Sequence, residues 1–538
     1  MLWGIAAPSY WRDEADTMSA VSRSLPQLIR LLGHIDAVHG AYYLLLWPVT
    51  RVFGTGEFAN RLPSALAMTG AALGIAAIAR RLRSRRAALC AGLVFAALPA
   101  VSIQAHDARP YAMVTAAAVL ASLAFVRAVD DPLPGRFAAY SLSLALLGYL
   151  HLFALLLIPA HAVALPGLRG RGNPGDRSTG YRRGSAGGPT DRPGLAGGHG
   201  HADRRSPAGG PGIPVVRGWF AAVTAACIAV TPLVALGWVQ RAQVVWISTP
   251  GWHAVDSLIA SLTAGSAASA VLIGLLAVLG GTRRDPPAAG WLVSVGARAG
   301  ATERRLTWLA APWLLLPPVT LLAVSQIRPI YYLLYVVFCL PAVALLAGSG
   351  LAAMGRPAKI AALALIAALA LPTQLAIRVP GHGESIRATA QTLAAHERPG
   401  DAVIYPGSGI PPWYLAYPAE FGPLRDIQTL KSGPASGRLY GLQVPPRVLA
   451  QRERGVCRIW AVEMGPPWPN PRGYLVPGFR LVHRWDPGGG DMRLWLYQRA
   501  GPSCRPQPAS TTTASTTDGT TASTTGGGQG AGSGGTGR

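Results

Sequence analysis

Residues 58–111 read FANRLPSALAMTGAALGIAAIARRLRSRRAALCAGLVFAALPAVSIQAHDARPY. An apolar run, 58–79, ends in an arginine-rich segment, and a second run, 87–104, ends in the polar motif 106–111. Runs of about 17–25 apolar residues are long enough to cross a bilayer as helices, and arginines gather at the cytoplasmic ends of such spans. The stretch therefore predicts a helical hairpin in the membrane that delivers residues 106–111 to the outer face.

The same alternation of apolar runs and arginine-rich loops continues along the chain. Further spans are predicted at 111–126, 137–166 (two short spans hinged near His151), 219–239, 258–279, 306–324, 331–354 and 360–377, about ten in all. Of the 538 residues, 50% are hydrophobic and 13% are charged, against about 25% charged in a soluble protein. The net charge of +24 fits arginine-rich cytoplasmic loops better than nucleic-acid binding, because the basic stretches lack interleaved aromatic residues.

The remaining segments surround this membrane part, residues 1–377. Residues 24–56 are amphipathic and predict external loop helices, either lying in the membrane interface or packed as an ordinary loop. Residues 167–217 are rich in Gly, Pro and Arg and predict a disordered cytoplasmic loop. Residues 378–503 predict a small extracytoplasmic α/β domain, with a helix at 384–396 and strands at 402–405, 456–462, 479–485 and 492–497. Residues 504–538 predict a disordered tail.

Two further features concern the chain ends. Residues 1–10 are apolar but too short to cross about 30 Å of hydrocarbon. Because Asp13 must lie outside if the later spans alternate, we expect a first helix to be missing from this chain. Cys457 and Cys504 both fall in the predicted outer domain and could pair, a question that their spacing leaves open.

Two short polar motifs stand beside predicted spans and carry the candidate chemistry. They are Trp11-Arg12-Asp13-Glu14 and the segment from His106 to Tyr111, and both are expected on the outer face. Ionisable residues are expensive in a membrane, about 2.5–3.5 kcal/mol each at a helix centre, so two such clusters indicate a function. One carboxylate of the Asp-Glu pair suffices to deprotonate an acceptor hydroxyl, and the planar fork of Arg109 suits a phosphate. Taken singly, the motifs are equally typical of a helix cap and a salt-bridged connector.

Together, these motifs resemble those of the GT-C membrane glycosyltransferases, most closely the family 39, protein O-mannosyltransferase-like and aminoarabinose transferase-like branch. The resemblance covers about residues 11–377 and implies an inverting transfer of a sugar, such as mannose or a related hexose, from a polyprenyl-phosphate carrier to an extracytoplasmic acceptor. Carried over by position, Asp13 would be the base and Glu14 would support it. Asp107 would orient the sugar or help to hold a divalent cation such as Mg²⁺ or Mn²⁺, and Arg109 would bind the donor phosphate. It also implies a bacterial plasma membrane protein acting on a protein or an envelope glycan or lipid.

Several residues form a weaker second group of candidates. Asp36 and His39, three residues apart, would reach one metal ion from a single helical turn, but they are more typical of the water-facing side of an interfacial helix. Arg328 is a second candidate for the donor phosphate. Possible substrate contacts are His39, Tyr111, His151 and Trp246; a packed histidine and an interfacial tryptophan are the ordinary alternatives for the last two.

Two other functions compete with the glycosyltransferase hypothesis. A transporter or flippase for a lipid-linked glycan would carry charges near the membrane midplane and repeated halves, whereas the acids here gather at one face. An inactive, truncated homologue would keep the motifs without the activity. The sequence favours a GT-C-like, polytopic α-helical membrane enzyme with an outer α/β domain.

Overall fold

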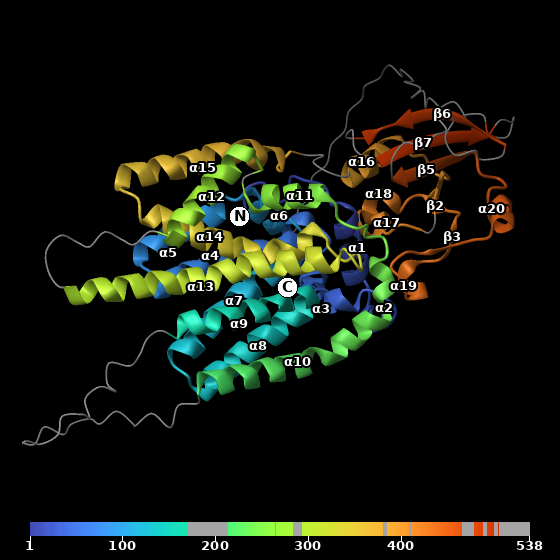
Figure 1. Cartoon of the computed structure of the whole chain (residues 1–538). Helices are drawn as coiled ribbons and strands as arrows, with labels where there is room; N and C mark the ends of the chain where they lie inside the picture. The colour runs from blue at the N-terminus through green and yellow to red at the C-terminus, as the bar shows by residue number, and fades with distance from the viewer. Residues whose placement is uncertain are drawn as a thin grey trace, which may run out of the picture.

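The computed structural model of the chain describes residues 1–169, 214–263, 265–282, 293–379, 385–407, 410–464, 478–487, 492–499 and Cys504. The predicted cytoplasmic loop at 167–217 lies almost entirely outside the described residues, and so does the predicted tail after Cys504. Within the described part, a long helical bundle occupies one side of the molecule and a small mixed domain the other (Figure 1).

The bundle is built from apolar helices. Its long members are α4 (Glu57–Leu82), α5 (Arg85–Ala97), α6 (Pro99–Ala105), α7 (Tyr111–Asp130), α8 (Pro134–Leu150), α9 (Leu157–Leu168), α10 (Val215–Val239), α11 (Trp252–Leu262), α12 (Ala267–Thr282), α13 (Val293–Val324), α14 (Leu340–Ala352) and α15 (Arg356–Ala376). Short 3-10 turns connect them at η2 (Leu152–Leu156), η4 (Arg241–Val244) and η5 (Leu333–Cys339).

These helices account for every predicted span, with α5 and α6 forming one span and α11 and α12 forming another. Among the described residues, six helices are long and apolar enough to cross a membrane, and two bent pairs raise the number to eight. The expected ten is reached by adding α8 and the segment Leu152–Leu168, which are shorter. The predicted span at 87–104 is bent by 67° between α5 and α6, because Pro99 cannot continue the hydrogen bonding of α5.

Small residues let the central helices approach closely. A Cβ atom added to Gly350 of α14 would lie 2.0 Å from the carbonyl oxygen of Leu276 on α12, and one added to Gly348 would lie 2.4 Å from the backbone of Ala91 on α5. The span Leu333–Ala352, formed by η5 and α14, is consequently the most enclosed of the six long spans in the described residues, with 83% of its apolar window buried. Backbone contact of this kind is typical of membrane helix packing, where apolar burial gives little advantage over lipid.

The first residues cover one end of the bundle. Residues 1–10 form turns and no helix, and α1 (Arg12–Val21), α2 (Leu25–His34), η1 (Ala37–His39) and α3 (Gly40–Phe53) follow. The predicted loop helices at 24–56 are thus confirmed as helices. On α2, Leu28 and Leu31 are buried, whereas Leu25 and Ile29 are exposed.

The C-terminal domain is a small α/β unit. It contains α16 (Ile386–His396), β1 (Ala402–Ile404), α17 (Trp413–Ala416), α18 (Pro418–Phe421), β2 (Arg425–Asp426), β3 (Thr429–Lys431), α19 (Gly433–Ser436), β4 (Leu442–Gln443), α20 (Pro446–Arg452), β5 (Arg458–Met464), β6 (Phe479–Trp485) and β7 (Met492–Arg499). The main sheet has the order β2-β1-β5-β7-β6, parallel on one side and antiparallel on the other. The helix and four strands expected from sequence are present, and β2 to β4 were not expected.

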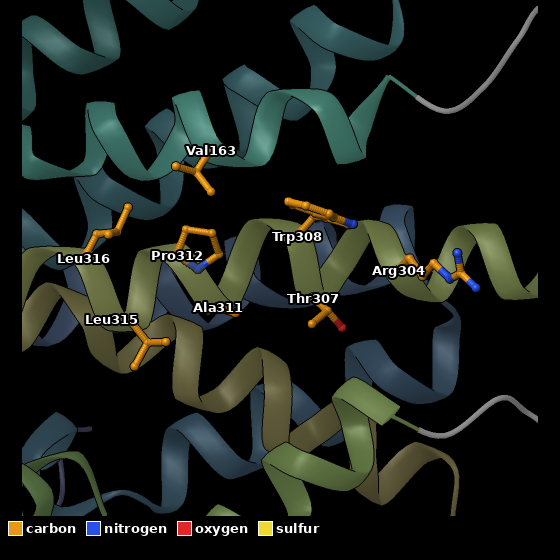
Figure 2. A pocket seen from close by; sticks show the side chains of 8 residues that line it. All are labelled: Val163, Arg304, Thr307, Trp308, Ala311, Pro312, Leu315 and Leu316. Atoms are coloured by element: carbon orange, nitrogen blue, oxygen red, sulfur yellow. The ribbon is translucent and has the colours of Figure 1, made fainter.

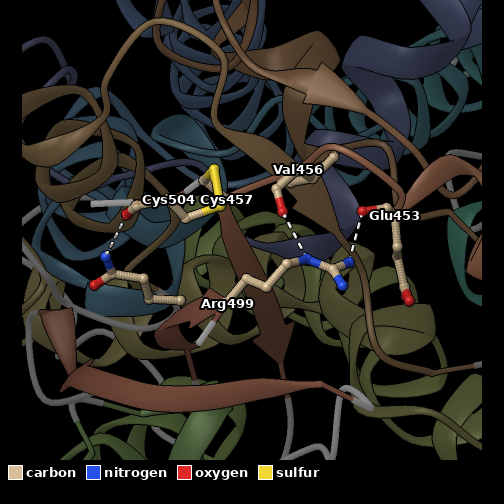
Figure 3. The surroundings of a disulfide bond; sticks show 6 residues. Glu453, Val456, Cys457, Arg499 and Cys504 are labelled. Atoms are coloured by element: carbon tan, nitrogen blue, oxygen red, sulfur yellow. Dashed lines mark hydrogen bonds between the residues drawn. A yellow bond between two sulfur atoms is a disulfide. The ribbon is translucent and has the colours of Figure 1, made fainter. Parts of the chain in front are cut away.

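A disulfide joins Cys457 to Cys504 at the edge of this sheet (Figure 3). Beside it, the guanidinium of Arg499 donates hydrogen bonds to the backbone oxygens of Glu453 and Val456, at 2.8 and 3.1 Å. The bond closes a separation of 47 residues, and together these contacts hold the end of β7 against the segment that precedes β5.

Polar contacts fix the domain on the bundle. Arg387 of α16 forms an ion pair of 2.5 Å with Glu57 at the start of α4, and the Tyr417 hydroxyl donates a hydrogen bond of 2.7 Å to the same carboxylate. Arg23, after α1, donates to the backbone oxygens of Gly433 and Arg438. The domain therefore sits directly over α1 and α2 (Figure 1).

Candidate active site

Glu14 of the first polar motif is a buried structural anchor. Its two carboxylate oxygens lie 2.8 and 2.6 Å from the guanidinium of Arg61 on α4, and the backbone N–H of Ala108 donates to it at 2.8 Å. Both side chains are about 1% exposed or less. Arg61 also donates to the backbone oxygens of Ile5, Pro8 and Ser9. Glu14 thus joins both predicted motifs, and its oxygens are fully engaged by protein donors.

Asp13, its neighbour in sequence, faces open space instead. Its side chain is 29% exposed and lines a polar cavity of about 500 Å³ at the junction of bundle and domain. Arg109 contacts Asp13 at 3.3 Å through its guanidinium, and its own side chain is 9% exposed. Burial alone would lower the pKa of Arg109, but the charge of Asp13 and those of other acidic groups raise it well above its usual value. Asp13 and Arg109 form an ion pair at the wall of the cavity.

Asp107 lies behind this wall rather than on it. The indole N–H of Trp11 donates to its carboxylate at 3.0 Å, and Ser64 donates to its backbone oxygen at 2.7 Å. Burial, and then the negative charge of Glu14, raise the pKa of Asp107 to about 8. The carboxyl is therefore largely protonated at neutral pH and orients Trp11, which does line the cavity.

Asp36 and His39 face the same cavity from the turn before α3. Nδ1 of His39 lies 2.6 Å from one oxygen of Asp36, and the Tyr43 hydroxyl donates a short hydrogen bond to the other. Burial would raise the pKa of Asp36, but the charge and hydrogen bond of His39, with that of Tyr43, outweigh it and lower the pKa to about 2. Gln243 and Gln240 accept hydrogen bonds from the backbone N–H groups of residues 36 and 37 and hold the turn in place.

This pair does not fit a metal ion. Both oxygens of Asp36 are engaged by side chains, and the described residues contain no group of three or more His, Cys, Asp or Glu side chains arranged to bind one. A divalent cation therefore stays a prediction.

A larger, apolar cavity opens beside the polar one. Its volume is about 630 Å³, and it shares Val38, His39, Gln243, Val244 and Tyr335 with the polar cavity. Arg241 and Arg328 stand at its edge, and their guanidinium groups lie 5.1 and 5.7 Å from the ring of Trp238. Neither arginine forms an ion pair with a carboxylate of the described residues. The apolar cavity therefore adjoins the polar one and has two cations in its own lining.

The structure brings most of the predicted site residues together. Asp13, Asp36, His39, Arg109, Tyr111 and Trp246 line the polar cavity, and His39, His151 and Arg328 line the apolar one. Glu14 and Asp107 line neither. Arg241 and Asp16 were missed, although Arg241 follows a span closely and Asp16 stands three residues after Asp13, on the same helix face.

Another cavity, between α9 and α13, lies away from these residues. It is lined mainly by apolar side chains such as Trp308 and Leu315, with Arg304 at one end (Figure 2). Arg304 begins the span Arg304–Val324. Arg328 follows the opposite end of that span and lines the apolar cavity described above. The acidic residues of the two motifs take no part in it.

Comparisons with known proteins find one matching family profile and solved structures of similar fold. The sequence profile of the dolichyl-phosphate-mannose-protein mannosyltransferase family matches residues 41–169. No curated protein matches the whole sequence significantly. The structure of ArnT from Cupriavidus metallidurans in the apo state matches with a TM-score of 0.55 and 12% identity, over 94% of this chain and 97% of that one. ArnT from the same organism bound to undecaprenyl phosphate matches with a TM-score of 0.51 and 13% identity, over 87% and 88%.

The identities are low, so the structural matches speak for the fold, and the profile match covers the segment from α3 to the end of α9. Both comparisons point to the same fold. The chain is a polytopic membrane protein with the GT-C glycosyltransferase fold, and it is similar to the family 39-like and ArnT-like glycosyltransferases.

Proposed function

We propose that the chain transfers a sugar from a polyprenyl-phosphate carrier to a hydroxyl-bearing acceptor on the outer face of a bacterial plasma membrane, with inversion. The observation that carries this proposal is the pair of joined cavities. The apolar one suits an isoprenoid chain, Arg241 and Arg328 suit the phosphate at its edge, and the polar one holds a carboxylate beside Arg109. Mannose or a related hexose is the sugar that we propose.

In this mechanism Asp13 accepts the proton of the acceptor hydroxyl as its oxygen attacks the anomeric carbon. The bond between that carbon and the phosphate oxygen breaks, and the phosphate leaves with the electron pair, which inverts the configuration. Phosphate is a good leaving group, so a general acid is not required. When Asp13 takes up the proton, its ion pair with Arg109 loses strength, and the guanidinium charge becomes available to the departing phosphate.

Two observations support the proposed orientation. Within α4, which has 26 residues, Arg61 at the site and the basic segment that begins at Arg80 are separated by about 28 Å at 1.5 Å per residue. Basic segments of this kind stay in the cytoplasm. The disulfide of the C-terminal domain favours an oxidising compartment, which is outside the cytoplasm. Both arguments support the proposal that the cavities open on the outer face.

The test is sugar transfer by the purified chain in nanodiscs, with undecaprenyl phosphate carrying mannose, glucose or aminoarabinose as donor. Asp13→Asn keeps the shape of the side chain and removes its basicity, so we expect transfer to fall by about 10²–10⁴-fold. Asp131→Asn, at the far end of α7, is the matched control. Unchanged transfer by Asp13→Asn, at equal protein levels, would reject the role of base. Movement of the lipid across the bilayer without transfer would indicate a flippase instead.

A further inference from the structure

Asp16 is an acidic side chain in the polar cavity that the mechanism above does not use. It lies on α1 three residues after Asp13, so both carboxyl groups project from the same face of the helix into the same space. One of its oxygens, Oδ1, is buried and has no hydrogen-bond partner among the described residues. A buried oxygen without a partner is energetically costly, and a bound molecule that donates a hydrogen bond to it would remove that cost.

We propose that Asp16 contacts the bound substrate and recognises one of its hydroxyl groups as a neutral carboxyl, which both donates and accepts a hydrogen bond. This inference rests on the proposed function, because it takes the ligand of the polar cavity to be a sugar or a hydroxyl-bearing acceptor. Asp13 remains the base, and Asp16 decides how the hydroxyl-bearing group is held beside it.

The surroundings of Asp16 explain why it differs from Asp13. Asp13 has the guanidinium of Arg109 at 3.3 Å, whereas no ion pair is formed by Asp16 within the described residues. Burial, and then the charge of Asp13, raise the pKa of Asp16 well above its usual value. Two carboxyl groups in one site are driven to different protonation states by such environments. The other titratable or charged groups near Asp16 are Arg12, Asp36, His39, Tyr43, Arg109, Tyr111, Tyr332, Tyr335 and Tyr440.

The first experiment measures binding of two lipids to the full chain in nanodiscs: bare undecaprenyl phosphate, and the sugar-bearing form that the wild type binds best. If Asp16 recognises the transferred sugar, Asp16→Ala weakens binding of the sugar-bearing lipid by about 10- to 100-fold and leaves binding of the bare lipid unchanged. If it recognises the acceptor, both lipids bind as before, and the KM for the acceptor rises by a similar factor.

Asp16→Asn tests the neutral form. An amide also donates and accepts hydrogen bonds, so this variant should lose clearly less affinity than Asp16→Ala. An equal loss in both variants would overturn the neutral carboxyl and indicate an ionised one that binds a cationic amino group. No change in Asp16→Ala in either measurement would overturn the contact itself. Failure of the wild type to bind any of the lipids would instead count against the proposed function.

The pH dependence gives an independent reading. The neutral form of Asp16 persists below its raised pKa and is lost as the pH rises through it, so wild-type affinity for the substrate falls on the alkaline side. Asp16→Asn cannot lose a proton at this position, so its affinity lacks the alkaline fall that is due to Asp16. Any pH dependence due to Asp107 is the same in both proteins. Identical pH profiles for the two proteins would contradict the proposal. Thermal unfolding controls for misfolding, and Asp16→Ser replaces Asp16→Ala if that variant does not fold.

Discussion

Two neighbouring regions of the molecule place acidic residues in opposite environments. Around Glu14, a carboxylate is sealed from water and meets a buried guanidinium and a backbone N–H. Around Asp13, one helical position away, a carboxylate is 29% exposed and faces a cavity of about 500 Å³. Adjacent residues of a helix point in different directions, so a single Asp-Glu pair supplies a structural anchor and a reactive group. The comparison predicts that stability and activity separate between the two positions.

The largest expected effect is on the anchor. Glu14→Gln removes the charge that compensates Arg61, and an uncompensated buried charge costs about 3–5 kcal/mol. We expect a large fall in the thermal unfolding temperature of the purified protein in detergent, with poor recovery from membranes. Asp13→Asn should unfold close to the wild type. Similar unfolding temperatures for Glu14→Gln and the wild type would break the comparison.

A smaller effect is expected at Asp107, which belongs to the anchor side but can relieve its burial by taking up a proton. Its folded pKa of about 8 lies above the unfolded value. The stability that it contributes is therefore complete below about pH 4 and is lost as the pH rises through 8. Unfolding temperatures measured from pH 5 to about pH 9 should fall less steeply for Asp107→Asn than for the wild type. Parallel curves would show that Asp107 does not titrate in this range.

The smallest effect is expected at the apolar cavity, where two arginines, Arg241 and Arg328, would both bind the phosphate. Each single change, Arg241→Ala or Arg328→Ala, should weaken binding of undecaprenyl phosphate by about tenfold or less, because a hydrogen bond to a charged group is worth about 1.5–3 kcal/mol and the other arginine remains. The double variant should lose clearly more. Arg484→Ala, on the exposed strand β6, is the matched control. Wild-type affinity in the double variant would indicate that the phosphate binds elsewhere, and Arg109 would be the next candidate.

Much of the fold follows from the sequence because spans depend on local composition. Apolar runs and arginine-rich ends are read residue by residue, and each predicted span has its helix. The 67° bend between α5 and α6 was missed, although Pro99 marks it. β2 and β4, of two residues each, carry too little pattern to be recognised.

The sequence identified which residues belong to the site better than it identified what each of them does. Ionisable residues beside spans identified Asp13, Arg109 and Asp36. The structural role of Glu14 depends on its ion pair with Arg61, 47 residues away, and no local sequence pattern connects the two residues. Arg61 did carry a signal of its own, because an arginine inside an apolar run requires a partner.

The first nine residues show a further consequence of how this protein is held together. Arginine and histidine side chains from elsewhere in the chain fix them through their backbone oxygens: His106 at Met1, Arg378 at Trp3, Arg61 at Ile5, Pro8 and Ser9, and Arg387 at Ala6, Ala7 and Pro8. A backbone oxygen is present whatever the side chain, so exposed residues of this stretch, such as Leu2, are free to change in evolution while the path of the chain stays constant. Three residues are exceptions: Gly4 has a φ of +70°, Ile5 is buried in the core, and the Ser9 hydroxyl accepts a hydrogen bond from the backbone N–H of Arg387. Aligned relatives should therefore vary most at the exposed positions of this stretch and keep these three.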